Sequence, residues 1–190
     1  QPTLASFVDG PSHMLVAVSE TVRRDILPAI ARGEKMVCFA LSEANAGSDV
    51  WNVQTKARRD GDDWIINGSK QWITNAPYAE YPIVFAITNE ELVAQHKGGI
   101  TAFLVEATAP GYSQDGVLAV MGHLGGDCGS MTLDNVRVPA ANMVGQEGHG
   151  FIMALGTVEW DRSALLAPWI GGTRKALRDS SRYATERKQF

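Results

Sequence analysis

The chain has 190 residues, of which 45% are hydrophobic and 20% charged, a composition typical of globular proteins that excludes a disordered tail. Seventeen basic and 21 acidic side chains give a formal net charge of −4, which argues against nucleic acid as a partner. No apolar run approaches the ~20 residues of a membrane-spanning helix, and no secretory signal peptide is recognisable at the start of the chain.

The first predicted element is a helical segment over residues 11–34. Pro28 is expected to interrupt its pattern and Gly33 to end it. The apolar side chains that recur every three or four positions are Met14, Leu15, Val18, Val22, Ile26 and Ile30.

Residues 36–139 change character, because short apolar and β-branched runs alternate with turn residues. This spacing is typical of an antiparallel barrel or sandwich. Asn67-Gly68 is predicted to form a tight hairpin turn, whose two central positions must accept positive φ. The glycine-rich stretch 122–130 is interpreted as a bend between strands. The predicted strands are Met36–Leu41, Trp64–Ile66, Gln71–Thr74, Tyr81–Thr88, Ile100–Val105 and Ser130–Val138.

Helical periodicity returns at about Gly150 and predicts one long helix, or two helices joined near residues 168–172. The predicted fold class is therefore α+β: a short helical N-terminal segment, a central antiparallel β-barrel or sandwich, and a long C-terminal helix or helix pair. The chain ends at Phe190 directly after a charged run, and we expect it to be a fragment of a longer protein.

A loop of small residues follows the first predicted strand, within Phe39–Asp49. Successive backbone N–H groups in such a loop can bind an anion such as phosphate, and Ser42 and Ser48 offer hydroxyl groups. The alternative is an ordinary strand-to-loop transition. The loop is not a Walker or dinucleotide-binding motif, because no helix follows its glycine.

The stretch Lys70–Asn75 pairs an aromatic ring with a hydroxyl group. On a strand Trp72 and Thr74 share one face, because the side-chain period is two. Such a pair could stack on a flat heteroaromatic ring and donate one hydrogen bond to it. The alternative is a tryptophan buried in the core.

Charged residues gather at Glu159–Arg162 in the last helical region, where Asp161 and Arg162 are too close in sequence to share a helix face. One of them could point into a cleft; the alternative is a solvated charged patch. The four histidines lack metal-ligand spacing, so a metal site is not expected, and the absence of a serine nucleophile motif argues against serine-hydrolase chemistry.

Taken in order, these stretches resemble the acyl-CoA dehydrogenase flavoprotein family, namely its middle β domain and the first long helix beyond it. The family pattern Asn-Gly-x-Lys-x-Trp-Ile-Thr-Asn, for example, is matched by Asn67–Asn75. The resemblance implies domains at 1–34 (the end of an N-terminal helical domain), 35–142 (middle β domain) and 143–190 (a truncated C-terminal helical domain). The other matching stretches are Phe39–Asp49, Val138–Gly145, Glu147–Phe151 and Tyr183–Phe190.

The resemblance implies that the cofactor is FAD. Trp72 and Ile73 would pack near the flavin, Thr74 would bond near its N5 atom, and the Leu41 backbone and Ser42 would lie at its pyrimidine edge. The other residues implied in FAD binding are Phe39, Gly47 and Ser48, with Arg187 and Gln189 reaching the FAD of a neighbouring subunit. The substrate-binding residues implied are Ser48, Glu159, Asp161 and Arg162.

The implied reaction is α,β-dehydrogenation of an acyl thioester such as acyl-CoA. A carboxylate removes the α-proton, hydride passes to flavin N5, and hydrogen bonds stabilise the enolate-like charge. In most members the catalytic glutamate lies in the C-terminal helical domain, which this chain lacks. A minority place the base on the helix after the β domain, where Asp161 stands, one methylene shorter than glutamate. Leu124 replaces the arginine usual in the family's Met-Gly-x-Arg-Gly bend.

The implied partners are an electron-transfer acceptor such as an electron-transfer flavoprotein and further copies of the chain in a dimer or tetramer. Cys38 and Cys128 match no disulfide framework and are interpreted as reduced core thiols. The expected location is the cytoplasm or the mitochondrial matrix rather than outside the cell. Two alternatives stay open: a same-fold acyl-CoA oxidase or flavin monooxygenase, and a non-catalytic module that binds FAD or a partner.

Overall fold

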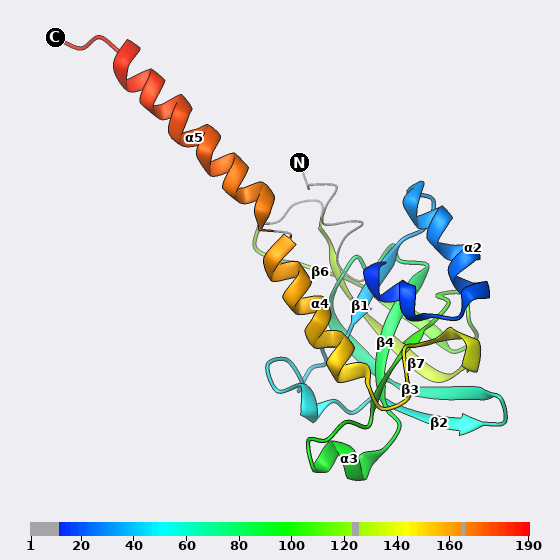
Figure 1. The fold of residues 1–190 in the computed structure, drawn as a ribbon. Coiled ribbons are helices and arrows are strands. Elements are labelled where there is room, and N and C mark those ends of the chain that lie inside the picture. The colour runs from blue at the N-terminus through cyan, green and yellow to red at the C-terminus, as the bar shows by residue number, and fades with distance from the viewer. Residues whose placement is uncertain (1–11, 123–125, 165) are drawn as a thin grey trace. The chain divides into compact units, whose positions relative to one another are not determined.

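The computed structural model describes residues 12–122, 126–164 and 166–190 (Figure 1). The chain divides into two compact units, one up to residue 157 and one from residue 158 onward, and each is described by itself. With η marking a 3-10 helix, the elements in chain order are η1 (Ser12–Ala17), α2 (Glu20–Ala31), β1 (Val37–Ala40), η2 (Val50–Asn52), β2 (Lys56–Asp60), β3 (Asp63–Thr74), β4 (Tyr81–Ile87), α3 (Glu90–Ala94), β5 (Ile100–Leu104), β6 (Tyr112–Leu118), β7 (Cys128–Pro139), η3 (Ala140–Asn142), β8 (Met143–Val144), α4 (Gly150–Ala164) and α5 (Ala167–Glu186).

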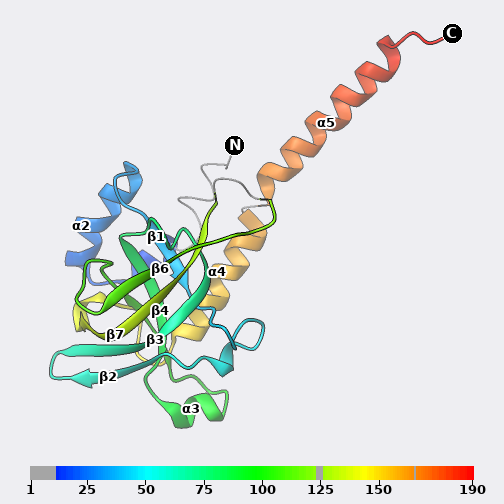
Figure 2. The ribbon, with the colours of Figure 1, turned by 180° about the vertical axis from the view of Figure 1, so that it is seen from behind.

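The strands of the described residues form one sheet in the order β6-β7-β3-β2-β4-β5-β8, and β1 is attached to β4 (Figures 1 and 2). Most neighbours are antiparallel. However, β1 runs parallel to β4, and β2 meets β4 in a single parallel pair, Lys56 with Ile87. The predicted α+β class is confirmed. The parallel pairing was not predicted, because the residues of one strand do not reveal the direction of its neighbour.

Alternate residues of β4 face two separate hydrophobic cores, because successive side chains of a strand point to opposite faces. Ile83 and Phe85 belong to the first core, and Val84 and Ala86 to the second. The first core also takes residues from η1, from α2 and from the link between them, namely Met14, Leu15, Val18, Ile26 and Ile30. The second core takes residues from β3 and β7, namely Trp64, Ile66, Ile73, Met131, Leu133, Val136 and Val138.

The N-terminal helical segment forms two helices. Ser19 caps α2, and its hydroxyl oxygen accepts a hydrogen bond from the Val22 N–H at 3.4 Å. The predicted interruption at Pro28 is wrong, because α2 continues through it to Ala31. The proline removes one backbone donor, but Ile26 and Ile30 on either side stay buried in the first core and hold the helix there.

The predicted hairpin turn at Asn67-Gly68 is also wrong, because β3 runs through both residues as one strand. The register of β3 with β7 shifts here, as at a β-bulge, and Gly68 has a φ of 151°. A Cβ atom on Gly68 would lie 2.4 Å from the Thr55 hydroxyl oxygen. Glycine is therefore needed here because two chain segments approach each other too closely for a side chain. The observed hairpin joins β2 to β3, where Asp60 pairs with Asp63.

The C-terminal region forms two helices, which was the second of the predicted alternatives. The junction lies slightly earlier than predicted, because α4 ends at Ala164 and α5 begins at Ala167. Pro168 lies in the first turn of α5, where its missing N–H costs no hydrogen bond. Within the described residues, no helix is both long and apolar enough to span a membrane.

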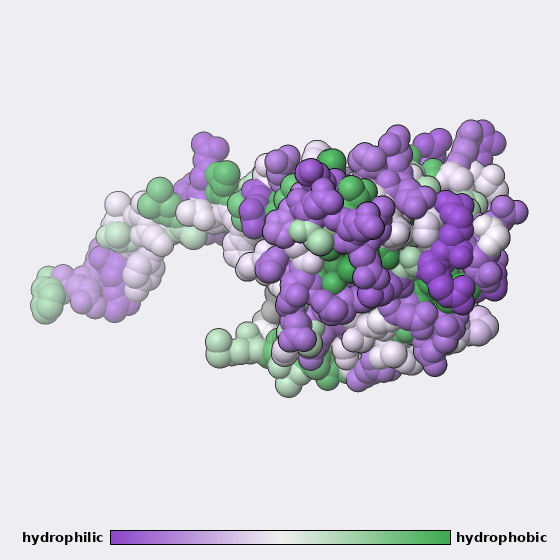
Figure 3. Space-filling model, turned by 90° about the horizontal axis from the view of Figure 1, so that it is seen from below, coloured by the Kyte–Doolittle hydropathy of each residue, from purple (hydrophilic) through white to green (hydrophobic). Residues whose placement is uncertain are grey.

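The first unit includes elements from all three predicted domains. Residues of η1 and α2 share a core with the sheet, and β8 pairs with β5. The domain boundaries at 34/35 and 142/143 therefore stay predictions. The predicted bend at 122–130 lies partly outside the described residues. Hydrophilic side chains cover most of the first unit's face in Figure 3.

Candidate functional site

The loop after β1 carries the first group of predicted flavin-binding residues. Phe39 is half-buried in β1, and its ring centroid lies 4.8 Å from that of Phe85. Leu41 and Ser42 are half-buried. Paired backbone hydrogen bonds between Glu43 and Ala46, of 2.9 and 3.2 Å, close the loop at this point.

The exposed part of this loop follows that closure. Gly47 and Ser48 are both exposed, so the Ser48 hydroxyl is accessible as predicted. Asp49 then caps η2, because its carboxylate accepts a hydrogen bond from the Trp51 N–H at 3.2 Å. The small residues between the Glu43–Ala46 hydrogen bonds and the Asp49 cap therefore leave this part of the loop exposed.

The end of β3 carries the second group. Trp72 is 56% exposed, so the alternative of a core tryptophan is wrong, and Ile73 beside it is only 2% exposed. Thr74 is exposed like Trp72. Trp72 has a φ of 62°, and the register of β3 with β7 shifts between Lys70 and Ile73. This irregularity turns a large aromatic ring outward from a strand whose other apolar residues are buried.

The two groups meet through the main chain. The Gln71 N–H donates a hydrogen bond to the Ser42 carbonyl oxygen at 3.0 Å. Gln71 directly precedes Trp72, so this bond places the loop next to the exposed ring. The predicted residues Leu41, Ser42, Trp72 and Thr74 therefore come from two segments that the fold brings together.

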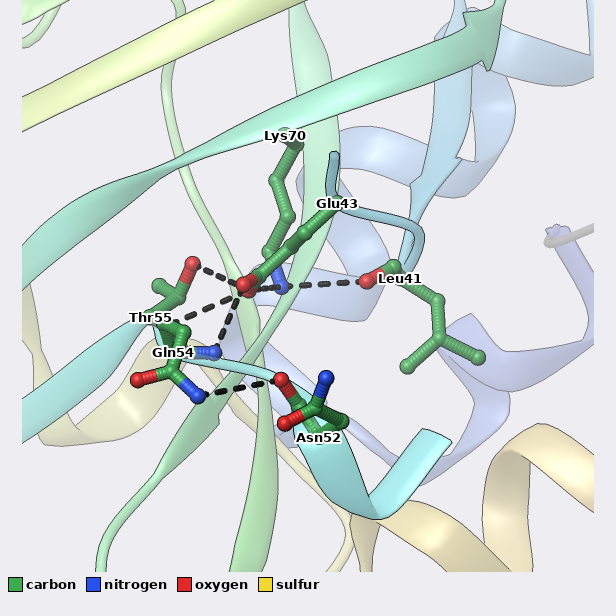
Figure 4. A network of polar contacts seen from close by, with 6 residues as sticks. All are labelled: Leu41, Glu43, Asn52, Gln54, Thr55 and Lys70. Atoms are coloured by element: carbon green, nitrogen blue, oxygen red, sulfur yellow. Dashed lines mark hydrogen bonds and ion pairs between the residues drawn. The ribbon is translucent and has the colours of Figure 1, made fainter. Parts of the chain in front are cut away.

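A buried ion pair lies beneath this junction (Figure 4). The Lys70 ammonium group lies 2.7 Å from a carboxylate oxygen of Glu43 and donates to the Leu41 carbonyl oxygen at 3.1 Å. Glu43 also accepts hydrogen bonds from the Gln54 N–H at 2.6 Å, the Thr55 N–H at 3.1 Å and the Thr55 hydroxyl at 2.6 Å. Lys70 is 1% exposed, and a charge buried so deeply requires such partners.

Burial and pairing shift both pKa values. Burial lowers the pKa of Lys70 to about 8, and the attraction of Glu43 limits that fall. For Glu43, burial opposes ionisation, but the charge of Lys70 and the hydrogen bonds from Lys70, Thr55 and Gln54 together keep its pKa below the ordinary value. Both groups are therefore charged at neutral pH.

The sequence interpretation assigned no role to Glu43, Lys70 or Thr55. Glu43 and Lys70 stand inside the two matching stretches, but 27 positions separate them, and no local spacing predicts their contact. The only available signal was the presence of two charged residues among the apolar and small residues of these stretches.

The remaining predicted residues belong to the second unit. Glu159, Asp161 and Arg162 lie within one turn of α4, where Asp161 is half-buried and the other two are exposed. Arg187 and Gln189 follow α5 and are exposed. The Arg187 guanidinium lies 6.0 Å from the centroid of the Tyr183 ring. Their roles toward FAD and substrate stay predictions.

Cys38 and Cys128 are free thiols. Cys38 is buried, and burial raises its pKa to about 12, which makes it unreactive. The expectation of a core position is wrong for Cys128, which is half-buried at the start of β7. Its sulfur lies 3.7 Å from the Thr74 hydroxyl oxygen.

The first unit has several cavities, two of which lie beside tryptophan residues. One of about 580 Å³ lies beside β2, and one of about 340 Å³ lies beside Trp51, whose ring stacks on His96 at 5.0 Å. Neither is lined by a residue predicted to bind flavin or substrate. Among the described residues, no three His, Cys, Asp or Glu side chains are grouped to hold a metal ion.

The donor set fits a flat heteroaromatic ring. Trp72 offers an exposed apolar plate, Thr74 offers a hydroxyl group two residues away, and Ser42 offers its hydroxyl on the adjoining loop. Such a surface can stack against a ring and bond to polar atoms at its edge. The exposed groups at this edge of the β domain therefore fit a flat aromatic cofactor.

Comparison with known proteins identifies the family. Residues 38–136 match the family model described as the middle domain of acyl-CoA dehydrogenase, so the chain belongs to the acyl-CoA dehydrogenase family. A probable acyl-CoA dehydrogenase of Bacillus subtilis (strain 168), YngJ, is 39% identical over 181 residues, which are 95% of this chain and 47% of that protein.

Comparison with solved structures supports the same family. Butyryl-CoA dehydrogenase from Megasphaera elsdenii has a TM-score of 0.85 at 34% identity, over 99% of this chain and 49% of that one. The prolyl acyl carrier protein oxidase AnaB has a TM-score of 0.86 at 34% identity, over 95% of this chain and 47% of that one. The chain thus spans about half the length of the curated relatives that it matches.

Proposed function

We propose that this chain forms part of an FAD-dependent enzyme that dehydrogenates an acyl thioester between its α and β carbons. The observation that carries the proposal is the exposed Trp72 on a strand whose preceding residue, Gln71, binds the Ser42 carbonyl of the glycine-containing loop. Relatives with acyl-CoA dehydrogenase names along 95% of the chain support the reaction class. Bound FAD would supply the oxidant, accepting hydride at N5.

The chain's own residues would bind and orient that cofactor. Trp72 would cover the flavin ring, and the Thr74 hydroxyl would donate a hydrogen bond near N5. The Leu41 backbone and Ser42 would meet the pyrimidine edge. Phe39 and Gly47 would line the ring, and Ser48 would reach both FAD and the thioester. Ile73 would contribute only its main chain, because its side chain is buried in the second core. Water exclusion by these groups would strengthen each hydrogen bond, because the local dielectric constant falls.

The candidate base within this chain is Asp161, with Glu159 and Arg162 beside the thioester. An Asp161→Asn variant that loses α-proton exchange on a bound thioester, while keeping FAD, would support this role. Unchanged exchange would exclude Asp161 as the base. Arg162→Ala should weaken thioester binding and leave FAD bound, and unchanged thioester affinity would contradict that assignment.

The assembly and the electron acceptor complete the proposal. Arg187 and Gln189 would contact the FAD of a second subunit, so a dimer or tetramer is part of the account. The electron acceptor would be a protein such as an electron-transfer flavoprotein, in the cytoplasm or the mitochondrial matrix.

A same-fold oxidase is the second candidate. One structure with a TM-score of 0.86 is a prolyl acyl carrier protein oxidase, and its identity to this chain equals that of the butyryl-CoA dehydrogenase. Oxygen consumption during turnover separates the two reactions. A dehydrogenase consumes little oxygen and needs an added acceptor, whereas an oxidase consumes oxygen in proportion to product.

The first test is an absorbance spectrum of the protein after incubation with excess FAD and removal of the unbound cofactor. We expect the two visible bands of a bound flavin. A colourless protein at FAD concentrations well above those that saturate the relatives would contradict flavin binding by this chain.

A further inference from the structure

The loop and β3 are joined by two hydrogen bonds from consecutive residues. Lys70 donates from its side chain to the Leu41 carbonyl oxygen at 3.1 Å, and Gln71 donates from its main chain to the Ser42 carbonyl oxygen at 3.0 Å. The next residue along the strand is Trp72. Two successive peptide groups of the loop are therefore fixed relative to the exposed ring.

This arrangement determines the direction of the Ser42 N–H. The peptide between Leu41 and Ser42 is trans, because the described residues contain no cis peptide bond. In a trans peptide the C=O and N–H groups point in opposite directions. Since the Leu41 carbonyl points at the buried Lys70, the Ser42 N–H points away from it. No acceptor within the described residues bonds to this N–H.

The charge on Lys70 affects the strength of that donor. A cation that binds the carbonyl of a peptide withdraws electron density and makes the N–H of the same peptide a stronger donor, as in cooperative hydrogen-bond chains. Among the described residues Lys70 donates to two acceptors, the Leu41 carbonyl and the Glu43 carboxylate, and both belong to the loop. Its ammonium group therefore acts on the loop alone.

Glu43 keeps Lys70 charged and in place. The carboxylate is fixed by the Gln54 N–H and by both donors of Thr55, at distances of 2.6 to 3.1 Å (Figure 4). Thr55 is completely buried and fits against Gly68, where a Cβ atom would be 2.4 Å from its hydroxyl. A chain of contacts thus runs from Gly68 through Thr55, Glu43 and Lys70 to the loop.

We propose that Lys70, held by Glu43, is a positioning residue that fixes the Leu41–Ser42 peptide beside Trp72 with its N–H directed outward as a donor to an electron-rich ring carbonyl of the cofactor. This inference rests on the proposed function only for the identity of the acceptor. The orientation of the peptide is a property of the chain itself.

The test uses the double variant Glu43→Gln/Lys70→Met in the full chain, which removes both charges and leaves no buried charge unpaired. The matched control is Lys56→Met, because Lys56 and Glu90 are also 2.7 Å apart but are exposed. Amide exchange is followed by NMR at Gln71, whose N–H binds the loop, and at Val84, which pairs with strands on both sides and reports global unfolding.

We expect the Gln71 amide of the double variant to exchange at least tenfold faster relative to Val84, and the dissociation constant for FAD to rise at least tenfold. The Lys56→Met control should match the wild type in both. Should the double variant not fold, Thr55→Val removes one donor to Glu43. This variant should also make the Gln71 amide exchange faster relative to that of Val84.

An unchanged ratio of Gln71 to Val84 exchange in a folded variant would overturn the proposal. Faster Gln71 exchange with an unchanged affinity for FAD would also overturn it, because the loop would then move without effect on the cofactor. If the wild type itself binds no FAD, the proposed function fails, while the exchange ratio still decides whether Lys70 positions the loop.

Discussion

The two units of the chain differ sharply in how they bury apolar side chains. In the first, both faces of β4 are buried, and Phe85 is completely inaccessible. In the second, the described residues of α5 include no buried residue, and the large apolar side chains Trp169, Ile170, Leu177 and Tyr183 are 60–73% exposed. Apolar and polar side chains both lie exposed on this helix (Figure 3).

The difference shows where the stability of the chain originates. Burial of apolar surface contributes about 25 cal/mol per Å², so the first unit can be stable by itself. A 20-residue helix that buries none of its residues gains little from packing, and by itself is only marginally stable in water. The candidate flavin residues of the loop and β3 belong to the first unit, with its two buried cores, whereas Arg187 and Gln189 belong to the second.

The largest expected contrast is between truncations of one large apolar side chain in each unit. Phe85→Ala should lower the free energy of unfolding by about 3–5 kcal/mol, because it opens a cavity in the first core. Leu177→Ala, on the exposed helix, should change it by less than about 0.5 kcal/mol. Urea unfolding of both variants measures this, and equal losses would contradict the comparison.

Glycine substitutions should have opposite signs in the two units. Gly68→Ala should destabilise by about 1–3 kcal/mol, because its Cβ atom would collide with Thr55 at a φ of 151°. Gly172→Ala should raise the helicity of α5, by about 0.5–1 kcal/mol of helix stability, since nothing lies within 4 Å of the added atom. Thermal unfolding tests the first and far-ultraviolet circular dichroism the second. A tolerated Gly68→Ala would contradict the close-approach explanation.

A smaller effect is expected from pH. The pKa of Glu43 is lower in the folded chain than in the unfolded one, so its contribution is complete above the ordinary glutamate pKa and is lost as pH falls through the folded value. Between pH 5 and pH 3 the wild type should therefore lose more stability than Glu43→Gln/Lys70→Met. Parallel pH profiles would show that the pair adds no acid sensitivity.

Much of the fold was predictable from apolar runs. β1, β4, β5 and β7 all lie where continuous or alternating apolar residues predicted them, because β1, β4 and β5 bury nearly every residue and β7 buries mostly alternate ones. β2 and β6 were missed, since β2 buries only Ala57 and β6 buries no residue. Strands paired mainly through their backbones leave no hydrophobic pattern. The error at Asn67-Gly68 has another cause, because a turn signal and a close approach of two segments both require glycine.

The site was predictable only in part. Trp72 and Thr74 are both exposed, as expected, but the outward position of Trp72 depends on a strand irregularity that the period-two argument did not include. The family pattern selected the loop beside them. The buried Glu43–Lys70 pair was not predictable, because it joins two distant segments through a contact that depends on the completed sheet. Local patterns identify exposed groups, whereas the contacts that position them are tertiary.

The most direct measurement of the central claim is an FAD titration of three proteins, the wild type, Trp72→Ala and Trp169→Ala, followed by flavin fluorescence. Both tryptophans are exposed, one in each unit, at 56% and 73%. Loss of ring stacking should weaken FAD binding of Trp72→Ala by about 1–3 kcal/mol, roughly 5- to 150-fold, and Trp169→Ala should bind like the wild type. Equal affinities of Trp72→Ala and the wild type would contradict the placement of the flavin on β3.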